Sequence, residues 1–454
     1  MSDSLTIKLT TKDLFKKTIF SIGLLVFTSL YTIVDSLFIS NYINTNALAA
    51  LNLAFPLITL TSAFAFMFST GGCAWVSIKL GEREEEKASK DFSLIVVFSF
   101  VVSIVLALIL ELYLDPIVHF LGATEETFNY TKQYLRITVL TSPIFILQIL
   151  YQGFLFVDNK GKLAFRLVFI SGVVNVIFDY IFIKIFGMGI RGAAWGTALG
   201  YLVWGVYGTY YFLRNKEGIH FSVPSKNKRV ILRTISNGMS EMVTSLSTSI
   251  TTFYFNYLTL KYLGADGVAA ISILLYCQFL FSSIFIGFSI GASPLIGYAW
   301  GARKYEYTDK LIKLCFRLVF IFSLLMFGIS FFGSNLVTGL FCRADNPVYD
   351  LAAHGLRLFS FSFLVCGISI ISSTIFTSIG DGKRSATISF LRVFIFTLLF
   401  LTILPMIFGV NGIWLAIPVA EVIMIFIDAI YLSKLSKKLK ILEKKYPFNK
   451  SVTA

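Results

Sequence analysis

Long apolar stretches alternate with short polar connections along the whole chain. A helix of about 20 apolar residues is enough to cross a bilayer core of roughly 30 Å. The pattern predicts twelve such helices, at residues 18–43, 48–76, 92–114, 133–157, 163–186, 193–213, 235–262, 268–297, 311–340, 351–379, 386–408 and 413–432. We therefore expect an all-α polytopic membrane protein with twelve transmembrane helices.

The second half of the chain repeats the pattern of the first half in the same direction. Equivalent positions lie 220 or 221 residues apart: Gly71 and Gly291, Gly81 and Gly301, Arg136 and Arg357, Gly161 and Gly382, Gly189 and Gly409. Parallel internal repeats are typical of transporters whose substrate path lies between the two halves. The repeat predicts two six-helix lobes related by a parallel pseudo-two-fold axis. We expect an N-lobe at residues 1–215, a cytoplasmic linker at 216–232, a C-lobe at 233–436 and a basic cytoplasmic tail at 437–454.

Composition supports the membrane class. The 454 residues are 56% hydrophobic and 14% charged, with a mean hydropathy of +0.78. Soluble domains have about 25% charged residues. The first apolar stretch follows a cluster of lysines, as a signal peptide would, but it is too long and lacks a small-residue cleavage site. We expect it to be retained as the first helix.

The net charge of +14 could indicate a nucleic-acid partner, but the placement of the basic residues argues against one. If the N-terminus is cytoplasmic, only seven of the 39 Lys and Arg lie on or near external connections, and the remaining 32 are assigned to the cytoplasmic side. The seven are Lys132, Arg136, Lys184, Arg191, Lys261, Arg343 and Arg357. By the positive-inside rule we expect both termini in the cytoplasm and a multi-pass protein of the plasma membrane.

The chain lacks the residue groups that an enzyme in the membrane would need. Its five cysteines show no paired or metal-ligand spacing, and its three histidines lie near loops or helix ends. A membrane-embedded enzyme, the alternative outside transport, would need a reactive His or Cys beside a base. We therefore expect no enzymatic activity, no cofactor and no metal beyond a coupling ion.

Acidic residues inside the apolar stretches are the strongest candidates for function, because each costs about 2.5 to 3.5 kcal/mol at a helix centre. Asp35 lies roughly 27 Å along the first helix from Lys17, and Asp179 lies roughly 20 Å along the fifth helix from Arg166. The two acids could share one depth. Asn175 is one turn before Asp179 and shares its helical face. An oxygen-only cluster of this kind suits a hard cation or a shared proton.

The second half has deep acids at other positions. Glu241 lies in the seventh helix and Glu421 in the twelfth, and neither matches Asp35 or Asp179 at the repeat offset. Asp428 lies closer to the predicted cytoplasmic end, where we expect it to reach water or to pair with Lys434. The two lobes should share their architecture and differ in their chemistry.

Several segments together resemble the multidrug and toxic compound extrusion (MATE) transporters. They are Tyr31-Thr-Ile-Val-Asp35, Ala47-Leu-Ala-Ala-Leu-Asn-Leu-Ala-Phe-Pro56, Asn175-Val-Ile-Phe-Asp179, Gly189-Ile-Arg-Gly-Ala-Ala-Trp-Gly-Thr197 and Phe288-Ser-Ile-Gly-Ala-Ser-Pro-Leu-Ile-Gly-Tyr-Ala-Trp-Gly-Ala302. The resemblance covers essentially the whole chain. It implies an inner-membrane antiporter that exports organic, often cationic and lipophilic compounds against inward flow of Na⁺ or H⁺.

The resemblance also implies residue roles. The N-lobe cation site of the DinF-like branch falls on four residues of the expected type, with a tyrosine beside it: Asp35, Asn175, Asp179 and Thr197, with Tyr31. Glu241 matches a seventh-helix acid of the NorM-like branch. The tenth helix of that branch adds an acid, which the Ser372-Ser373-Thr374 region lacks, so a complete C-lobe cation site is not implied. The first helix also lacks the proline at which several relatives bend, so no proline kink is expected.

The substrate site should be an apolar cleft with a few polar and aromatic groups, which suits small amphipathic cations. The candidate lining residues are Gln148, Gln152, Glu241, Tyr254, Asn256 and Gln278. We expect a monomer in the lipid bilayer that works by alternating access. The choice between Na⁺ and H⁺ stays open, because both use carboxylate oxygens. A lipid-precursor flippase is the alternative within transport, but it would need a basic cavity, whereas the deep acids indicate a negative one.

Overall fold

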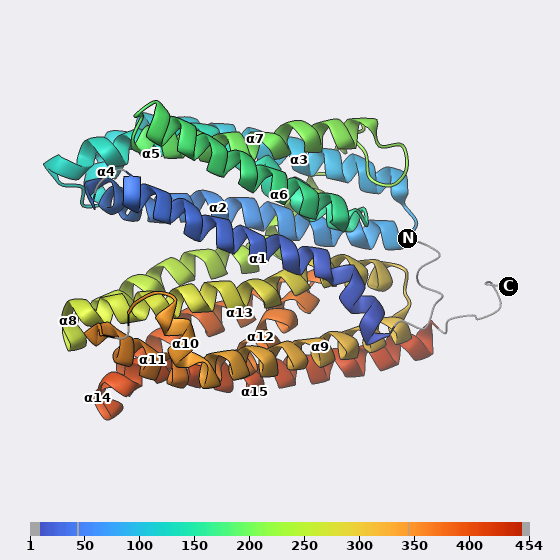
Figure 1. Ribbon diagram of the computed structural model, residues 1–454. Coiled ribbons are helices and arrows are strands. Elements are labelled where there is room, and N and C mark those ends of the chain that lie inside the picture. Colours follow the sequence, from blue (N-terminus) through green and yellow to red (C-terminus); the bar gives the residue numbers. More distant parts are fainter. Residues whose placement is uncertain (1–9, 43–44, 344, 447–454) are drawn as a thin grey trace. The chain divides into compact units, whose positions relative to one another are not determined.

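The computed structural model describes residues 10–42, 45–343 and 345–446. For residues 33–42, 45, 46, 48 and 49 it describes only the course of the helix, and their side chains lie outside the described part. Within these ranges the chain forms helices joined by short turns, with no strand (Figure 1). The all-α architecture predicted from the apolar pattern is confirmed.

The first half contains helices α1 (Thr11–Tyr42), α2 (Thr45–Gly81), α3 (Glu85–Leu112), α4 (Leu114–Phe120), α5 (Glu125–Val157), α6 (Gly161–Asp179), the π-helix η2 (Tyr180–Ile185) and α7 (Ile190–Arg214). The second half contains α8 (Lys228–Gly301), α9 (Tyr305–Phe332), α10 (Ser334–Gly339), α11 (Pro347–Phe359), α12 (Phe361–Ser378), α13 (Gly382–Phe390), the π-helix η3 (Leu391–Phe396), α14 (Thr397–Phe408) and α15 (Val410–Lys445). In the described ranges, ten helical segments are long and apolar enough to cross a membrane. One of these segments, α8, holds two spans that meet at Gly264 (φ 65°), and α7 provides one more span. Each of the twelve predicted spans therefore corresponds to a helix.

Some predicted helices differ from their patterns in detail. The stretch at 351–379 divides into α11 and α12 at Ser360, and the stretches at 163–186 and 386–408 contain the π-helical turns η2 and η3. Helix α15 continues to Lys445, beyond residue 436 where the C-lobe was expected to end. Leu435 and Leu439, four residues apart, are both 2% exposed. This apolar face packs against the protein, which keeps the start of the basic tail helical.

The chain forms two compact units. The N-terminal unit is Gly23–Gly238, and the C-terminal unit is Met1–Ile22 with Met239–Ala454. Helices α1 and α8 each pass from one unit to the other without a break in the helix. The lobe boundaries expected at residues 215 and 233 stay predictions.

Small residues and interlocking rings pack the N-terminal unit. Helix α2 packs against α5, and α7 packs against both α5 and α6 (Figure 1). At the centre, the Phe92 ring lies 4.7 Å from the rings of Phe154 and Phe212, measured between centroids. The absence of a side chain at Gly208 makes room for the ring of Tyr151. Close approach at small residues is the usual way that helices associate in membranes.

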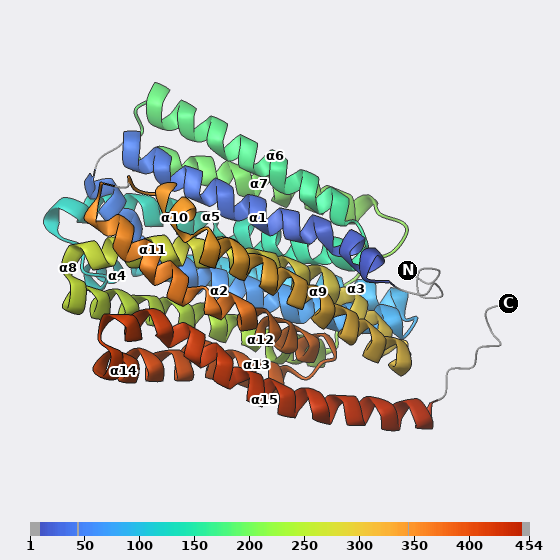
Figure 2. The ribbon, with the colours of Figure 1, turned by 60° about the horizontal axis from the view of Figure 1, so that its bottom comes forward.

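In the C-terminal unit, α12 packs against α9, α13 and α15, while α14 packs against α15 (Figure 2). Gly367 of α12 lies against the ring of Phe285, and Gly355 of α11 lies against the indole of Trp414. Buried serine and threonine hydroxyls fill much of the space between α12 and α13. These helices position the polar side chains of this unit.

The turns show the internal repeat directly. Backbone φ angles are positive at matched positions of the two halves: Arg83 (62°) and Arg303 (56°), Asn159 (60°) and Gly380 (81°), Gly189 (59°) and Gly409 (56°). Each pair is 220 or 221 residues apart. The hydrogen bonds match as well, since Glu84 N–H donates to Lys79 and Lys304 N–H donates to Ala299. This bond closes a Schellman turn at a helix end.

Candidate functional site

A buried polar pair marks the end of α6. Asn175 is 3% exposed and Asp179 is completely buried, and they stand one turn apart on the same face of the helix, as the sequence predicted. Thr197 lies opposite them on α7, and its Oγ1 accepts a hydrogen bond from Asn175 Nδ2 at 3.4 Å. The structure therefore brings together three of the four residues expected at the cation site.

Glycines on α7 allow this close approach. A Cβ atom at Gly196 would overlap Asp179 Oδ1, so the carboxylate occupies the space that a side chain would fill. One turn further, a Cβ at Gly200 would lie 3.2 Å from the carbonyl oxygen of Ser171. Ser171 Oγ donates to the Gly200 carbonyl at 2.7 Å and fixes the two helices against each other. The Gly192, Gly196 and Gly200 spacing thus positions Asp179.

Helix α1 lies against the same part of α6. A Cβ at Gly172 would stand 3.4 Å from Tyr31 Cδ1, which places the Tyr31 ring one turn before Asn175. Asp35 follows Tyr31 by one turn of α1. Its side chain lies outside the described residues, so the pairing of Asp35 with Asp179 stays a prediction. No proline interrupts α1, and it runs as one helix from Thr11 to Tyr42.

The backbone changes its helical form directly after the site. Asp179 is the last α-helical residue of α6, and the π-helical turn η2 begins at Tyr180. Such turns are rare and often occur at functional sites. The chain then turns through Gly187 and Gly189, both with positive φ, into α7. The site is therefore built by one helix, its π-helical end and the returning helix.

The residues expected to line a substrate cleft fall on both units. In the N-terminal unit Gln148 is 3% exposed and Gln152 is half-buried, with no hydrogen-bond partner at Gln148 Oε1. In the C-terminal unit the Tyr254 hydroxyl pairs with Thr402 Oγ1 at 3.0 Å. Asn256, Gln278 and Glu241 are half-buried there. Their role as a lining stays a prediction.

The sequence analysis missed Arg392. It was counted among the 32 basic residues of the cytoplasmic side, but it lies within η3 with its side chain only 15% exposed. Its Nη1 donates to Glu421 Oε1 at 3.4 Å, and its charge also reaches Glu241. A signal was present: ten residues separate Arg392 from the start of α13, which corresponds to roughly 15 Å of helix.

The expectation for Asp428 was wrong. It was expected to reach water or Lys434, but its side chain is completely buried, and Asp428 Oδ2 accepts a hydrogen bond from Ser369 Oγ at 2.6 Å. Asp428 is two turns after Glu421 on α15, so both acids face the interior of the unit. The physical reason is that α12 covers this face of α15.

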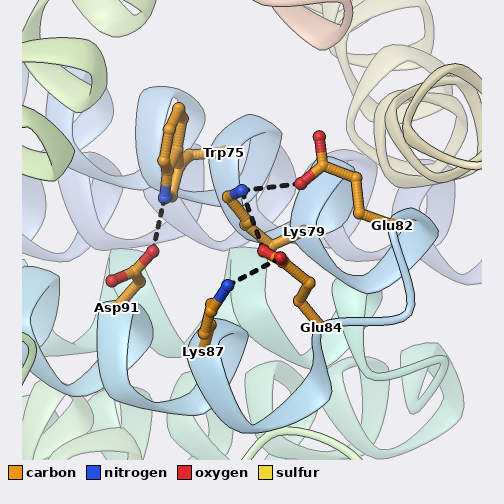
Figure 3. A network of polar contacts seen from close by, with 6 residues as sticks. All are labelled: Trp75, Lys79, Glu82, Glu84, Lys87 and Asp91. Atoms are coloured by element: carbon orange, nitrogen blue, oxygen red, sulfur yellow. Dashed lines mark hydrogen bonds and ion pairs between the residues drawn. The ribbon is translucent and has the colours of Figure 1, made fainter.

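A second polar network closes the turn between α2 and α3 (Figure 3). Trp75 Nε1 donates to Asp91 Oδ2 at 2.8 Å, while Lys79 pairs with Glu82 at 2.6 Å and with Glu84 at 3.0 Å. Lys87 approaches Glu84 from the other side at 2.7 Å. These ion pairs are partly exposed, and surface pairs contribute 0 to about 1 kcal/mol. The network holds the α2–α3 hairpin.

Among the described residues, no group of three or more His, Cys, Asp or Glu could hold a metal ion. Four of the five cysteines are buried, and none forms a disulfide in the described ranges. The polar groups around Asp179 are a carboxylate, an amide and a hydroxyl. They could supply oxygen ligands to Na⁺, or the carboxylate could take a proton.

Known proteins share this fold and sequence pattern. A model of the MatE family matches residues 21–181 and 241–403. The multidrug export protein MepA of Staphylococcus haemolyticus is 26% identical over 414 residues, which cover 91% of this chain and 91% of MepA. A MATE protein solved in complex with MaL6 superposes with a TM-score of 0.90 at 19% identity, covering 96% of this chain and 98% of that one. A MOP superfamily transporter from Pyrococcus furiosus superposes with a TM-score of 0.89 at 20% identity, with 95% and 97% covered.

The family match extends through both halves of the chain and includes α6, where the buried Asn175 and Asp179 lie. The solved structures have the same arrangement of twelve transmembrane helices in two lobes. The chain therefore belongs to the MatE family of membrane transporters.

Proposed function

We propose that this protein is a cation-coupled antiporter that exports lipophilic, cationic organic compounds, as the name of its relative MepA suggests for multidrug export. It acts by alternating access as a monomer in the plasma membrane, with both termini in the cytoplasm. The coupling ion is Na⁺ or H⁺, held at Asp35, Asn175, Asp179 and Thr197 beside Tyr31.

The burial of Asp179 is the observation that carries this proposal. An ionised carboxylate with no exposed surface is strongly destabilised unless a cation or a proton compensates its charge. Asn175 and Thr197 add neutral oxygen atoms, and Gly196 fixes the position of the carboxylate. A group that is stable only when neutralised can respond to a cation gradient.

Coupling needs one more property. The cation must bind one conformation of the transporter more tightly than the other, and the substrate must prefer the opposite conformation. The turn from α6 into the π-helical η2 lies next to Asp179 and can change with the charge of that residue. Binding of the cation from outside then favours the inward-facing conformation, and substrate binding favours the opposite one.

Substrate recognition rests on the residues proposed to line the cleft. They are Gln148, Gln152, Glu241, Tyr254, Asn256 and Gln278. Glu241 supplies negative charge for a cationic compound, while the amides and the tyrosine supply hydrogen bonds and a ring face. Since Arg392 reaches Glu241, the attraction depends on the carboxylates of this unit together.

The test uses purified protein in proteoliposomes loaded with ethidium. Efflux is measured under a Na⁺ gradient at equal pH, and separately under a pH gradient without Na⁺. We expect one gradient to drive efflux in the wild type and neither to drive it in Asp179→Asn. Asp91→Asn is the matched control, because Asp91 is also buried in the N-terminal unit but bonds to Trp75 at the α2–α3 turn.

Full gradient-driven efflux by Asp179→Asn would contradict the proposal. A wild type that ignores both gradients but transfers a lipid-linked pyrophosphate between leaflets would be a flippase instead. In a separate measurement of binding to the purified protein, Glu241→Gln should weaken the binding of tetraphenylphosphonium by about 1 kcal/mol. The effect on a neutral compound should be smaller.

A further inference from the structure

A second buried charged group lies in the C-terminal unit, apart from the residues of the N-terminal unit described above. It consists of Arg392, Glu421 and Asp428, with the Ser369 hydroxyl bonded to Asp428. Glu421 is 6% exposed and Asp428 is completely buried. No hydrogen-bond partner is present at Glu421 Oε2 or Asp428 Oδ1, although each other oxygen has one.

The charges of this group do not balance. Two ionised carboxylates beside one guanidinium leave one excess negative charge in a buried place. The described groups whose charges reach Glu421 are Arg392 and Asp428, and those acting on Asp428 are Arg392 and the Ser369 hydroxyl. The charge of Arg392 also reaches Glu241, a half-buried acid of α8, so this guanidinium serves three acids. Helix α14, which packs on α15, has no charged residue. Since leaving a buried charge unpaired costs several kcal/mol, the group needs at least one more positive charge.

The geometry favours a proton over a metal ion. Arg392 lies 3.4 Å from Glu421, so its guanidinium would repel a bound cation across the same short distance. A proton bonds directly to a carboxylate oxygen and needs no shell of ligands. It also turns one of the two unpartnered oxygens into an O–H group, which removes the charge of that carboxylate.

A row of buried hydroxyls begins one turn of α12 beyond Ser369. Ser373 stands one turn after Ser369 on α12 and lies 2.8 Å from Ser385 Oγ and 3.1 Å from Ser389 Oγ. Ser385 Oγ lies 2.6 Å from Thr377 Oγ1, which lies 3.4 Å from Ser240 Oγ. Thr377 and Ser385 each stand one turn from Asp381, a partly exposed residue that caps α13. Neutral hydroxyls that both donate and accept can pass a proton along such a row.

We propose that one exchangeable proton binds to Glu421 or Asp428 beside Arg392, and that the hydroxyls of α12 and α13 lead it toward the α12–α13 turn. The proton comes from water, binds a carboxylate oxygen and changes the charge of the group from minus one to zero. Its use in export rests on the proposed function, since it gives the transporter a proton site besides the one around Asp179.

Infrared difference spectra of the purified full-length protein, recorded between mildly alkaline and mildly acidic buffer, test this directly. Protonation of a carboxylate produces a C=O band of a carboxylic acid. We expect such a band in the wild type and its loss in both Glu421→Gln and Asp428→Asn, because either change removes the excess negative charge. Each amide copies the shape of the protonated acid, so both variants should fold.

Arg392→Gln should have the opposite effect. Without the guanidinium both acids need a proton, so the band should grow. Asp91→Asn, a buried acid outside this group, should leave the band unchanged. The band does not depend on Asp179, so Asp179→Asn should keep it even if export is lost, which separates this proposal from the coupling site.

Two results would overturn the proposal. One is a band that Glu421→Gln, Asp428→Asn and Arg392→Gln all leave unchanged. The other is a band that disappears when Na⁺ replaces choline in the buffer, because the group would then hold a metal cation in place of the proton.

Discussion

At the scale of single residues, the absence of a side chain decides where the carboxylate of Asp179 lies. Position 196 faces α6 at the level of Asp179, and only glycine leaves that space free. The same helix has another glycine, Gly205, whose Cβ would meet only Ile144 Cγ2 at 3.1 Å. The end of a side chain can shift by a few tenths of an ångström, whereas Asp179 is held by its own backbone and by its burial.

We therefore predict that Gly196→Ala abolishes gradient-driven ethidium efflux. The added methyl group must displace the carboxylate or separate α6 from α7, and overpacking of this kind costs about 1 to 3 kcal/mol. Efflux and thermal unfolding of the purified variant provide the measurement. Gly205→Ala is the control and should transport almost like the wild type. Equal efflux by both variants would show that Gly196 does not position Asp179.

Sequence reasoning succeeded where the relation between two residues lies within one helix. Asn175 and Asp179 are four residues apart, and this spacing alone places them on one face. It failed where the partner belongs to another helix. Asp428 was expected to reach water because α12 could not be known to cover it. Arg392 was assigned to the cytoplasmic side, although it lies inside the helix predicted at residues 386–408. A residue's depth follows from helix ends, and those are the least certain part of a pattern.

At the scale of elements, Asp158 joins three segments of the N-terminal unit. It follows the last residue of α5, and its carboxylate accepts hydrogen bonds from the Tyr211 hydroxyl at 2.6 Å, from Asn215 Nδ2 at 3.1 Å and from the Ile219 N–H at 3.1 Å. Gly218 approaches the same carboxylate with a positive φ of 84°. The end of α5 is thus tied to the end of α7 and to the segment that follows it.

This tie should make stability depend on pH. Burial raises the pKa of Asp158 above its usual value of 3.8, and the bonds from Tyr211 and Ile219 only partly oppose this. An acid with a raised folded-state pKa contributes stability that is complete below its unfolded pKa and is lost as pH rises through the folded pKa. We predict that the melting temperature of the wild type falls relative to that of Asp158→Asn as the pH rises through the window between 3.8 and the raised folded-state pKa of Asp158.

The control for this prediction is Tyr211→Phe. It removes a donor that lowers the pKa of Asp158, so the window should move to higher pH. Parallel melting curves for the wild type and Asp158→Asn at every pH would show that Asp158 does not titrate in this window.

The α2–α3 hairpin gives a second prediction at this scale. Arg83 has a φ of 62°, a left-handed conformation that costs an ordinary residue about 1 kcal/mol and costs glycine little. Its N–H donates to the Leu80 carbonyl at 3.1 Å within the Schellman turn. We expect Arg83→Gly to raise the free energy of unfolding by up to about 1 kcal/mol. Arg83→Ala removes the charge but keeps the left-handed strain, so it should leave the free energy of unfolding unchanged. An equal increase in both variants would show that the charge, and not the backbone strain, is responsible.

At the scale of the whole molecule, the alternation of apolar and polar stretches predicted all twelve spans, and the spacing of glycines predicted the parallel repeat. The repeat holds for the backbone, as the matched turns at Asn159 and Gly380 show. The π-helical turns η2 and η3 were not predicted, because a π-turn leaves no signature in hydropathy. Asp179 and Arg392 both lie at these turns. The sequence therefore predicted the membrane spans and the repeat, but not the π-helical backbone beside the charged residues Asp179 and Arg392.

Membrane orientation remains a prediction that labelling can test. The basic residues place the connection between α7 and α8 in the cytoplasm and the start of α5 outside. Four of the five cysteines are buried, so we expect little labelling of native cysteines once Cys342 is replaced by alanine. We expect an impermeant maleimide to label Glu126→Cys in intact cells and Lys226→Cys only after lysis. Labelling of Lys226→Cys in intact cells would mean the inverted orientation.

The two left-handed arginines have a consequence for how the protein is made. Arg83 and Arg303 occupy the same turn in both halves, where glycine would relax the backbone of the finished protein. During synthesis, however, Lys and Arg beside an emerging helix decide which end stays in the cytoplasm, before any turn has formed. An arginine at each of these turns therefore fits the predicted cytoplasmic position of both hairpins. A doubly glycine-substituted chain should be more stable once folded, yet a larger share of its molecules should enter the membrane the wrong way round.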